Sequence, residues 1–193
     1  MGEKKEIRIN GILEAAINEF VEKGYKDASM ESIAKRAGLS KGGLYHHFGS
    51  KVEILYEVNI QIMEPVAELM VQIEKDSSLV NGINRFISNY LDYWNNNKKL
   101  LKLFFVTLNE ALNNDKIIES YRESSIQNFD YFEYLFSKGE KESIFKSGDN
   151  RSRAIALLSC LDGYLGYLIM APALPLEEIK KEIQEIFINA HIK

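Results

Sequence analysis

The side chains of this sequence that could take part in chemistry gather between Lys41 and Lys51, where two adjacent histidines follow a tyrosine. The single cysteine, Cys160, lies far away in an apolar run. An enzyme that uses His46, His47 or Cys160 needs a base, an orienting carboxylate or a glycine-rich phosphate loop, and none of these accompanies them in the sequence. We therefore expect no catalytic residue and no enzymatic activity.

Metal coordination is an equally poor explanation of the two histidines. Neighbouring residues on a helix point about 100° apart, so His46 and His47 do not converge on one ion. No third ligand lies near them in the sequence. The sequence predicts no metal site and no cofactor.

Binding of a polyanion explains this segment better than catalysis or metal coordination does. Gly42 and Gly43 stand in the first turn of a short helix, where each costs about 1 kcal/mol relative to alanine. Because glycine has no side chain, the backbone can come close to a binding partner. At a helix N-terminus, the expected partner is an anion or a base edge.

A second positive feature follows directly. Ser50 and Glu53 have the spacing of a capping box, so another helix is expected to begin at Lys51. The dipole of that helix and the Lys51 ammonium would lie beside Tyr45 and the two histidines. Such a cluster is suited to gripping phosphates.

Two short helices must position these side chains. Ser29 is a good N-cap for an apolar-periodic helix, and the glycine after that helix is expected to stop it in the left-handed conformation. Ser40 caps the next helix, in which Leu44 and Phe48 share one face while the histidines point elsewhere. The connection of three residues favours crossed helices. Residues 29–48 are therefore predicted to form a helix-turn-helix.

This segment resembles the DNA-binding part of the TetR family of bacterial transcriptional regulators, whose pattern is roughly I-A-x-x-A-G-[VL]-S-x-G-x-[LI]-Y-x-[HY]-F-x-[ST]-K. The residues that fit the pattern are Ile33, Ala34, Ala37, Gly38, Leu39, Ser40, Gly42, Leu44, Tyr45, His47, Phe48, Ser50 and Lys51. The similarity extends upstream through Phe20 and Gly24-Tyr25.

The resemblance implies roles for individual residues, because in the family the helix that starts at Lys41 lies in the major groove. The residues implied to contact base edges are Lys41, Gly42 and His46. Those implied to contact phosphates are Tyr45, His47, Lys51 and the helix N-terminus that begins at Met30. Double-stranded DNA is the partner that follows.

The charge distribution is compatible with DNA binding but provides no broad basic patch. The net charge is -4, yet residues 1–51 hold nine Lys or Arg against seven Asp or Glu, a balance of +2 that leaves -6 for the rest. DNA affinity should therefore come from a few placed cations and fall with salt. The lone cysteine and the absence of an apolar leader at the N-terminus favour the cytoplasm.

The rest of the chain has helical periodicity throughout, which predicts an all-α protein with about nine helices. We expect a DNA-binding domain over 6–66 and a helical effector-binding and dimerisation domain over 67–193. The helices are expected at 6–23, from Lys51 to a kink or restart at Pro65, at 79–95, 98–112, 116–138 and 151–171, and after the turn at Pro172 and Pro175. A mostly polar connection is expected from Gly139 to Asn150.

The stretch 151–171 is long and apolar enough to suggest a membrane span, but Asp162 in its middle argues against one. A heptad seam of small side chains explains it better. That seam comprises Ser152, Ala156, Ser159, Gly163, Gly166 and Met170. The opposite face, which includes Ile155, is expected to be buried. With Ile179, Ile183 and Ile186 of the last helix, the seam fits the four-helix dimer interface that the resemblance implies.

Aromatic residues are frequent in the middle helices, and most such residues are ordinary core. With a few polar groups they could also line an apolar cavity, and the resemblance implies a small effector here. The candidate lining residues are Tyr90, Trp94, Phe105, Asn109, Tyr121, Phe129 and Asp162. Few cations fall on the inner faces, which favours a hydrophobic, neutral or cationic effector.

These observations predict a ligand-responsive transcriptional regulator that binds a palindromic operator as a homodimer. By the resemblance it is a repressor, released from DNA by a small hydrophobic effector. The alternative is an all-helical small-molecule or partner-binding protein without sequence-specific DNA binding. Selective DNA binding discriminates between the two.

Overall fold

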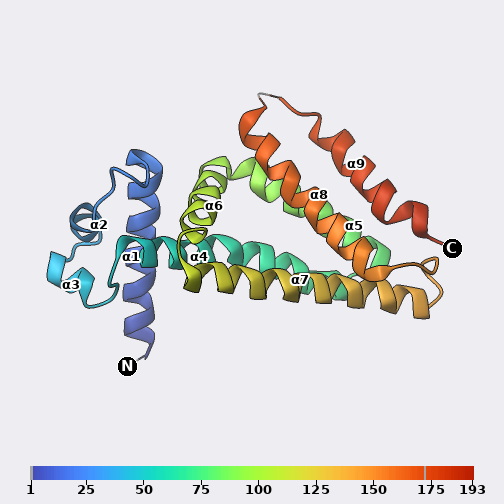
Figure 1. The fold of residues 1–193 in the computed structure, drawn as a ribbon, viewed down its shortest axis with the longest axis horizontal. Helices are drawn as coiled ribbons and strands as arrows, with labels where there is room; N and C mark the ends of the chain where they lie inside the picture. The colour runs from blue at the N-terminus through green and yellow to red at the C-terminus, as the bar shows by residue number, and fades with distance from the viewer. Residues whose placement is uncertain (1, 172) are drawn as a thin grey trace. The chain divides into compact units, whose positions relative to one another are not determined.

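The structure is a computed structural model that describes residues 2–171 and 173–193, with side chains from residue 5 onward. Its described residues form nine α-helices and two short 3-10 helices, with no strand longer than an isolated bridge, so the predicted all-α class is confirmed (Figure 1). The helices are α1 (Gly2–Lys23), α2 (Met30–Arg36), α3 (Lys41–Tyr45), α4 (Lys51–Gln72), α5 (Leu79–Asn96), α6 (Lys98–Ala111), α7 (Asp115–Lys141), α8 (Asn150–Met170) and α9 (Leu176–Phe187). The 3-10 helices are η1 (Ile73–Lys75) and η2 (Asn189–His191). The turn expected at Pro172 lies outside the described residues.

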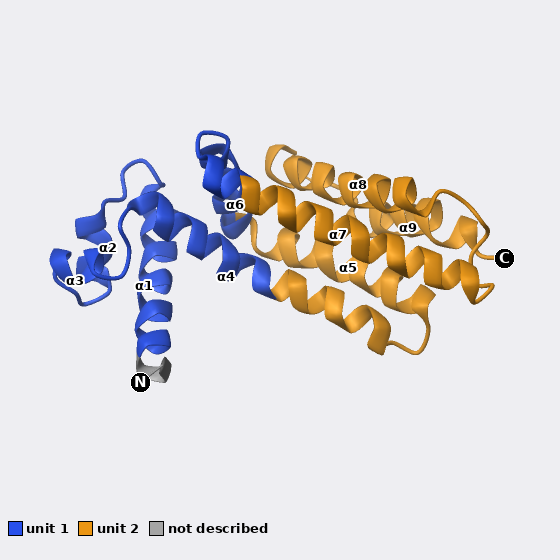
Figure 2. Ribbon diagram, turned by 60° about the horizontal axis from the view of Figure 1, so that its bottom comes forward, with its two compact units in different colours: residues 1–64, 99–118 blue, residues 65–98, 119–193 orange. Residues whose placement is uncertain are grey.

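The chain divides into two compact units, coloured separately in Figure 2. Unit 1 consists of residues 1–64 and 99–118, and unit 2 of residues 65–98 and 119–193. The first division falls two residues before the domain boundary expected at 66. Residues 99–118, which the sequence analysis assigns to the second domain, group with unit 1 instead.

Unit 1 is built on α1, which packs against α2, while α2 packs against α3. Leu13, Ala16 and Phe20 of α1 are almost completely buried, as the apolar spacing of this helix predicts, and Ile12 is buried with them. Ile33 of α2 and Leu44 of α3 are both 0% exposed. These residues form the core that holds the two short helices.

Helix α4 does not end at Pro65, because the structure has one helix from Lys51 to Gln72 with the proline inside it. Of the two predicted alternatives, the restart is therefore wrong, and the kink stays a prediction. Proline lacks a backbone N–H, so its helical turn lacks one hydrogen bond. The boundary between the two units coincides with this turn.

The centre of unit 2 is α5, which packs against η1, α8 and α9. Trp94 is 0% exposed, and the ring of Phe86 lies 5.2 Å from that of Phe132 on α7. Burying such large aromatic side chains is the main source of stability in a helical core. The inner face of α5 is thus used for packing.

Helix α7 runs further than predicted, continuing through Gly139 to Lys141. The reason is a tertiary contact. The ring of Phe145 occupies the space where a β-carbon at position 139 would lie, at 2.3 Å. The glycine therefore admits a buried ring and does not end the helix.

Helix α8 is long and apolar enough to cross a membrane by length and composition alone. In the structure it packs against α5 and α9, with Ala154, Leu157 and Leu161 fully buried. Its apolar content thus serves a helical core on one side. The other side is exposed and combines small residues with the larger Ile155, Tyr167 and Met170.

Candidate nucleic-acid interface

The helix-turn-helix is fixed by local hydrogen bonds at its two caps. The Ser29 hydroxyl accepts from the backbone N–H of Ser32, and Ser32 Oγ accepts from the N–H of Ser29, both at 3.1 Å. Ser40 Oγ accepts from the N–H of Gly43 at 3.0 Å. Between the helices, Gly38 has φ +67°, the left-handed conformation in which glycine is favoured. Both predicted caps and the predicted stop therefore exist.

Helix α3 presents a polar outer face because its Leu44, and Phe48 just after the helix, are buried. Leu44 is 0% exposed and Phe48 is 5% exposed. On the outside, Lys41, Gly42 and His46 are exposed, and Tyr45 leaves 47% of its surface free. The buried pair anchors a short rigid element whose outer residues face solvent.

The two histidines lie at the end of this element. The helix ends at Tyr45, His46 is its C-cap, and His47 lies in the following turn, half-buried. Their ring centroids are 5.5 Å apart in an edge-on arrangement. No cluster of three or more His, Cys, Asp or Glu side chains suited to a metal occurs among the described residues.

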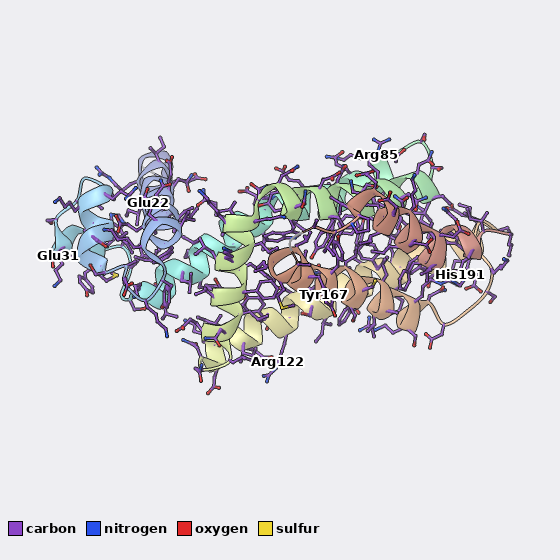
Figure 3. The ribbon with its side chains drawn as sticks, turned by 90° about the horizontal axis from the view of Figure 1, so that it is seen from above. Glu22, Glu31, Arg85, Arg122, Tyr167 and His191 are labelled. Atoms are coloured by element: carbon purple, nitrogen blue, oxygen red, sulfur yellow. The ribbon has the colours of Figure 1, made fainter. Side chains whose placement is uncertain are left out.

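The N-terminus of α2 offers backbone groups only. Met30 is largely buried, at 9% exposure, so its side chain faces the core. The neighbouring Glu31 is exposed and carries a negative charge (labelled in Figure 3). Any phosphate contact predicted for this helix start therefore falls to main-chain N–H groups.

Lys51 is placed differently from the prediction. Its ammonium donates to the backbone carbonyls of Tyr25 at 2.6 Å, Lys26 at 3.2 Å and Ala28 at 2.7 Å. It also lies 4.4 Å from the centroid of the Tyr25 ring. An ammonium has three N–H donors, and all three are used here. The structure therefore favours a structural role for Lys51, which ties α4 to the turn before α2, over the predicted phosphate contact.

An ion-pair network, which the sequence analysis missed, fixes α2 on α1. Arg36 of α2 donates to Glu19 at 2.8 Å and also pairs with Glu22. Lys23 lies 2.7 Å from the second Glu19 oxygen. The hydrogen bond from Lys23 lowers the pKa of Glu19 most, burial opposes it, and Arg36 lowers the pKa further, to about 2. The sequence does show that Glu19 and Lys23 are four residues apart on one helix, a spacing that favours an ion pair.

Acid should weaken this network. Because the pKa of Glu19 is about 2 in the folded chain and 4.5 ordinarily, its stabilisation is complete above pH 4.5 and is lost as the pH falls towards 2. Glu19→Gln should lower the free energy of unfolding by about 2 to 3 kcal/mol at pH 7. Urea unfolding at pH 7 and pH 2 tests this, since the two proteins should converge at pH 2. A difference that persists there would assign the effect to packing.

Three of the seven residues predicted to line an effector cavity, Tyr90, Trp94 and Asp162, lie together in unit 2. Trp94 is fully buried and Tyr90 is 6% exposed, and both belong to the core of unit 2. Tyr90 donates to Asp162 at 2.7 Å. Asp162 is exposed as a residue. Loss of hydration around its carboxyl group raises the pKa of Asp162, and the hydrogen bond from Tyr90 opposes this shift. This pair joins α5 to α8.

The other four predicted lining residues divide between the units. Phe105 and Asn109 belong to unit 1, where Phe105 is half-buried and Asn109 is exposed. Tyr121 and Phe129 belong to unit 2 and are half-buried. The Arg151 guanidinium lies 5.8 Å from the Phe129 ring centroid.

The small-residue seam of α8 lies on the surface of the chain. Five of its six residues are exposed and the sixth is half-buried, and Met170 is 72% exposed. The seam residues are Ser152, Ala156, Ser159, Gly163, Gly166 and Met170. Tyr167 beside it is 59% exposed (labelled in Figure 3). Ile155, expected to be buried, is 38% exposed on the same side.

Helix α9 contributes less apolar surface than expected. Ile186 is 55% exposed and Ile179 is half-buried. Ile183 is only 5% exposed, so its prediction as an interface residue is wrong. It is buried because α9 packs against α5 and α8 within unit 2.

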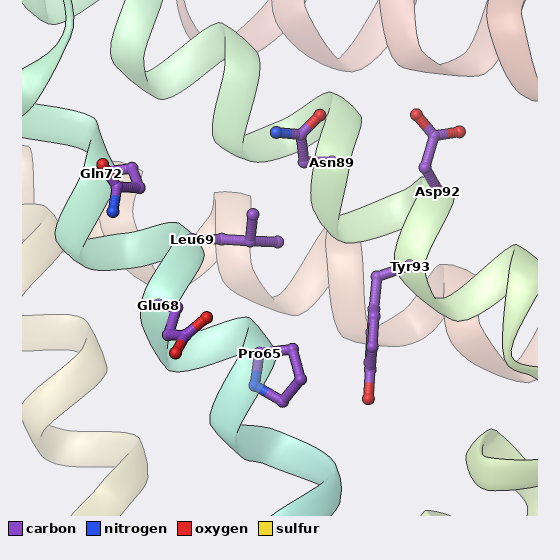
Figure 4. A pocket seen from close by; sticks show the side chains of 7 residues that line it. All are labelled: Pro65, Glu68, Leu69, Gln72, Asn89, Asp92 and Tyr93. Atoms are coloured by element: carbon purple, nitrogen blue, oxygen red, sulfur yellow. The ribbon is translucent and has the colours of Figure 1, made fainter.

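A groove of about 330 Å³ in unit 2 was missed by the sequence analysis (Figure 4). Its lining comes from the second half of α4 and the outer side of α5. The lining residues are Pro65, Glu68, Leu69, Gln72, Asn89, Asp92 and Tyr93. The spacing of three and four residues places the lining residues on one face of α4 and on one face of α5. It does not show that these two helix faces meet.

Comparison with known proteins gives the same interpretation of the N-terminal segment. Residues 12–58 match the profile of the bacterial regulatory proteins, tetR family. The transcriptional regulator TtgW of Pseudomonas putida is 39% identical over 64 residues, which are 33% of this chain and 47% of TtgW. The transcriptional repressor AcnR of Corynebacterium jeikeium is 32% identical over 84 residues, 43% of this chain and 42% of AcnR. The matches thus span less than half of these relatives.

Similarity in fold extends over nearly the whole chain. The crystal structure of a protein described as a TetR-family transcriptional regulator from Mesorhizobium loti superposes with a TM-score of 0.78. It covers 97% of this chain and 98% of that one, at 20% sequence identity. With the capped helix-turn-helix, the match over 12–58 shows that the N-terminal part of the chain belongs to the bacterial regulatory proteins of the tetR family.

Proposed function

We propose that this protein is a ligand-responsive transcriptional repressor that binds a palindromic operator as a homodimer in the cytoplasm. The observation that carries the proposal is the outer face of α3. Its polar residues are exposed while Leu44 and Phe48 anchor it from within. A short helix held in this way is the geometry that enters a major groove. The transcriptional repressor AcnR, 32% identical over 84 residues, supports repression over activation.

The proposed contacts follow from exposure. Lys41, Gly42 and His46 face solvent at the start and end of α3 and are assigned to base edges. Tyr45 and His47, with the backbone at the N-terminus of α2, are assigned to phosphates. Lys51 is omitted because its ammonium protons are already used.

Selection of bound DNA from a random pool by the purified protein tests the function. A dimer should enrich a palindrome whose half-sites lie about 34 to 36 Å apart or somewhat more. A pool without enrichment would favour the alternative of a small-molecule or partner-binding protein. A transcription assay with the selected site then determines the sign, because an activator would raise output where a repressor lowers it.

Alanine at position 42 tests the close approach of backbone to DNA. A β-carbon there meets nothing within 4 Å, so Gly42→Ala should leave the fold intact and raise its stability by up to about 1 kcal/mol. Operator affinity should nevertheless fall by about tenfold, because the methyl group would separate α3 from a base edge. Melting temperature and gel-shift titration measure the two effects. Unchanged affinity would exclude a close approach at this residue.

The exposed seam of α8 supports the proposed homodimer. Small side chains along one helix face let a second helix come close, and a two-fold axis would pair the seam with its own copy. Ile186 and the half-buried Ile179 extend this surface on α9. Ile183 is excluded by its burial.

Glutamate at position 163 should dissociate that dimer. No atom lies within 4 Å of a β-carbon at Gly163, so the protomer accepts the side chain, but a close helix pair would have to bury two charges. We expect Gly163→Glu to be monomeric in sedimentation experiments at concentrations where the parent is dimeric. Operator affinity should fall more than tenfold. A dimer of unchanged stability would place the interface elsewhere.

The aromatic residues Tyr90 and Trp94 are packed in the core of unit 2, and the Asp162 carboxylate already accepts a hydrogen bond. Ligand response at these residues would require the core to open. We retain a small hydrophobic or cationic molecule as the effector class.

A further inference from the structure

We propose that the groove between the second half of α4 and the outer side of α5 binds a small organic cation with an apolar body. The inference rests on the proposed function only in treating this molecule as the effector.

The shape of the groove comes from two helix faces that meet within unit 2. Residues 65–72 of α4 form one wall and residues 89–93 of α5 the other (Figure 4). A volume of about 330 Å³ is at the small end of ligand sites in proteins. Such a space holds a molecule of about the size of one aromatic ring with a substituted ammonium.

Apolar surface makes up most of the lining. Pro65 and Leu69 present aliphatic carbon from α4, and Tyr93 presents its half-buried ring from α5. The ring centroid of Tyr93 lies 5.0 Å from that of Trp94, which belongs to the core. The Tyr93 ring is thereby held in place. An aromatic face fixed in this way attracts a substituted ammonium.

The charge of the groove selects a cation. Glu68 is exposed and forms no ion pair among the described residues. Asp92, on the opposite wall, is paired with Lys180 of α9 at 2.5 Å. Glu68 therefore adds a negative charge without an ion-pair partner next to apolar carbon, and Asp92 shares its one cationic partner with Glu177. A cation complements it, while an anion would be repelled.

This site differs from the interior cavity that the sequence analysis predicted. Tyr90 and Trp94 point into the core from the inner face of α5, whereas Asn89, Asp92 and Tyr93 line the outer side. A ligand in the groove would not need the core to open. Among the lining residues, the amides of Gln72 and Asn89 supply polar groups that can orient a bound molecule.

The groove has a direct connection to α9. Lys180 is 6% exposed and bridges Asp92 and Glu177, at 2.5 and 2.7 Å. Gln184, one turn further along α9, donates to Ser88 of α5 at 2.8 Å. A bound cation near Asp92 would compete with Lys180 for this carboxylate. Ligand binding would then loosen the attachment of α9, which carries part of the proposed dimer surface.

Benzyltrimethylammonium is a suitable probe, with N-benzylacetamide as the neutral comparator and phenylacetate as the anionic one. Trp94 is the only tryptophan of the chain, so its fluorescence reports on the neighbouring Tyr93, and calorimetry gives an independent affinity. We expect saturable binding of the ammonium compound. The neutral and anionic compounds should bind at least about tenfold more weakly.

Variants locate the site. Glu68→Gln should weaken binding by about three- to fivefold, whereas Glu185→Gln, which removes an exposed carboxylate of α9, should change nothing. Tyr93→Phe should retain affinity and Tyr93→Leu should lose it, because only the ring is needed. Equal binding of all three compounds, or no response to Glu68→Gln, would overturn the proposal.

Operator release is measured separately by gel shift. Release by benzyltrimethylammonium in the parent, with a weaker effect in Glu68→Gln, supports the site as that of the effector. If the cation binds in the groove and the operator stays bound, the site stands and the effector role fails. If no DNA is bound at all, the proposed function fails while the calorimetric result still decides the site.

Discussion

Alanine at position 82 is expected to destabilise unit 2 by about 3 kcal/mol, the largest effect of a single methyl group in this chain that we predict. A β-carbon on Gly82 would lie 2.1 Å from the carbonyl oxygen of Ile73 and 2.9 Å from its carbonyl carbon. Both atoms belong to the backbone of η1, so no side-chain rotation relieves the overlap. The start of α5 would have to move away from η1. Urea unfolding of Gly82→Ala measures the loss.

Gly11→Ala is the matched control. Gly11 lies within α1, and a β-carbon there meets nothing within 4 Å. The same substitution at this position should raise stability by up to about 1 kcal/mol, because alanine favours a helix more than glycine does. Opposite signs at the two positions are therefore expected. Equal stability of the two variants would contradict the close contact between Gly82 and η1.

Local signals in the sequence predict the helix-turn-helix because its geometry depends on neighbouring residues. Ser29 and Ser40 each accept from an N–H three residues on, so type and spacing are sufficient to identify them. Gly38 adopts its positive φ for the same local reason. The amphipathic spacing of the longer helices other than α4 likewise gives their ends within a few residues. These features do not require knowledge of the tertiary structure.

Contacts between distant residues explain what the sequence did not predict. Gly139 lies inside α7 because a ring six residues later packs on it. Ile183 has the spacing of an interface residue, but α9 buries it against its own unit. The groove depends on the approach of α4 and α5, which neither helix encodes by itself. In each case one apolar or polar pattern is compatible with several partners, and only the tertiary fold selects one.

Replacing Lys51 should have the second large effect. The kind of loss distinguishes a structural role of this lysine from contact with DNA. Lys51→Met removes three donors and a charge but keeps the length of the side chain. The carbonyls of Tyr25 and Ala28, now at 2.6 and 2.7 Å from the ammonium, would lose their partner. Hydrogen bonds from a charged donor contribute about 1.5 to 3 kcal/mol each, and the third contact is exposed. We expect the free energy of unfolding to fall by about 2 to 4 kcal/mol.

Lys41→Met is the control that distinguishes stability from DNA contact. Lys41 and Lys51 each occupy the first position of a helix, α3 and α4 respectively. The side chain of Lys41 is exposed to solvent, whereas that of Lys51 is half-buried. We expect unchanged stability and a loss of about 1 to 3 kcal/mol in operator binding, concentrated on the selected sequence. Lys51→Met should instead lower the melting temperature and, well below it, retain most of its affinity. If Lys51→Met melts like the parent and binds all DNA weakly, its ammonium must leave the three carbonyls for a phosphate, and the structural role is wrong. The two lysines thus test whether a cation at a helix start is held by the protein itself or left available for DNA.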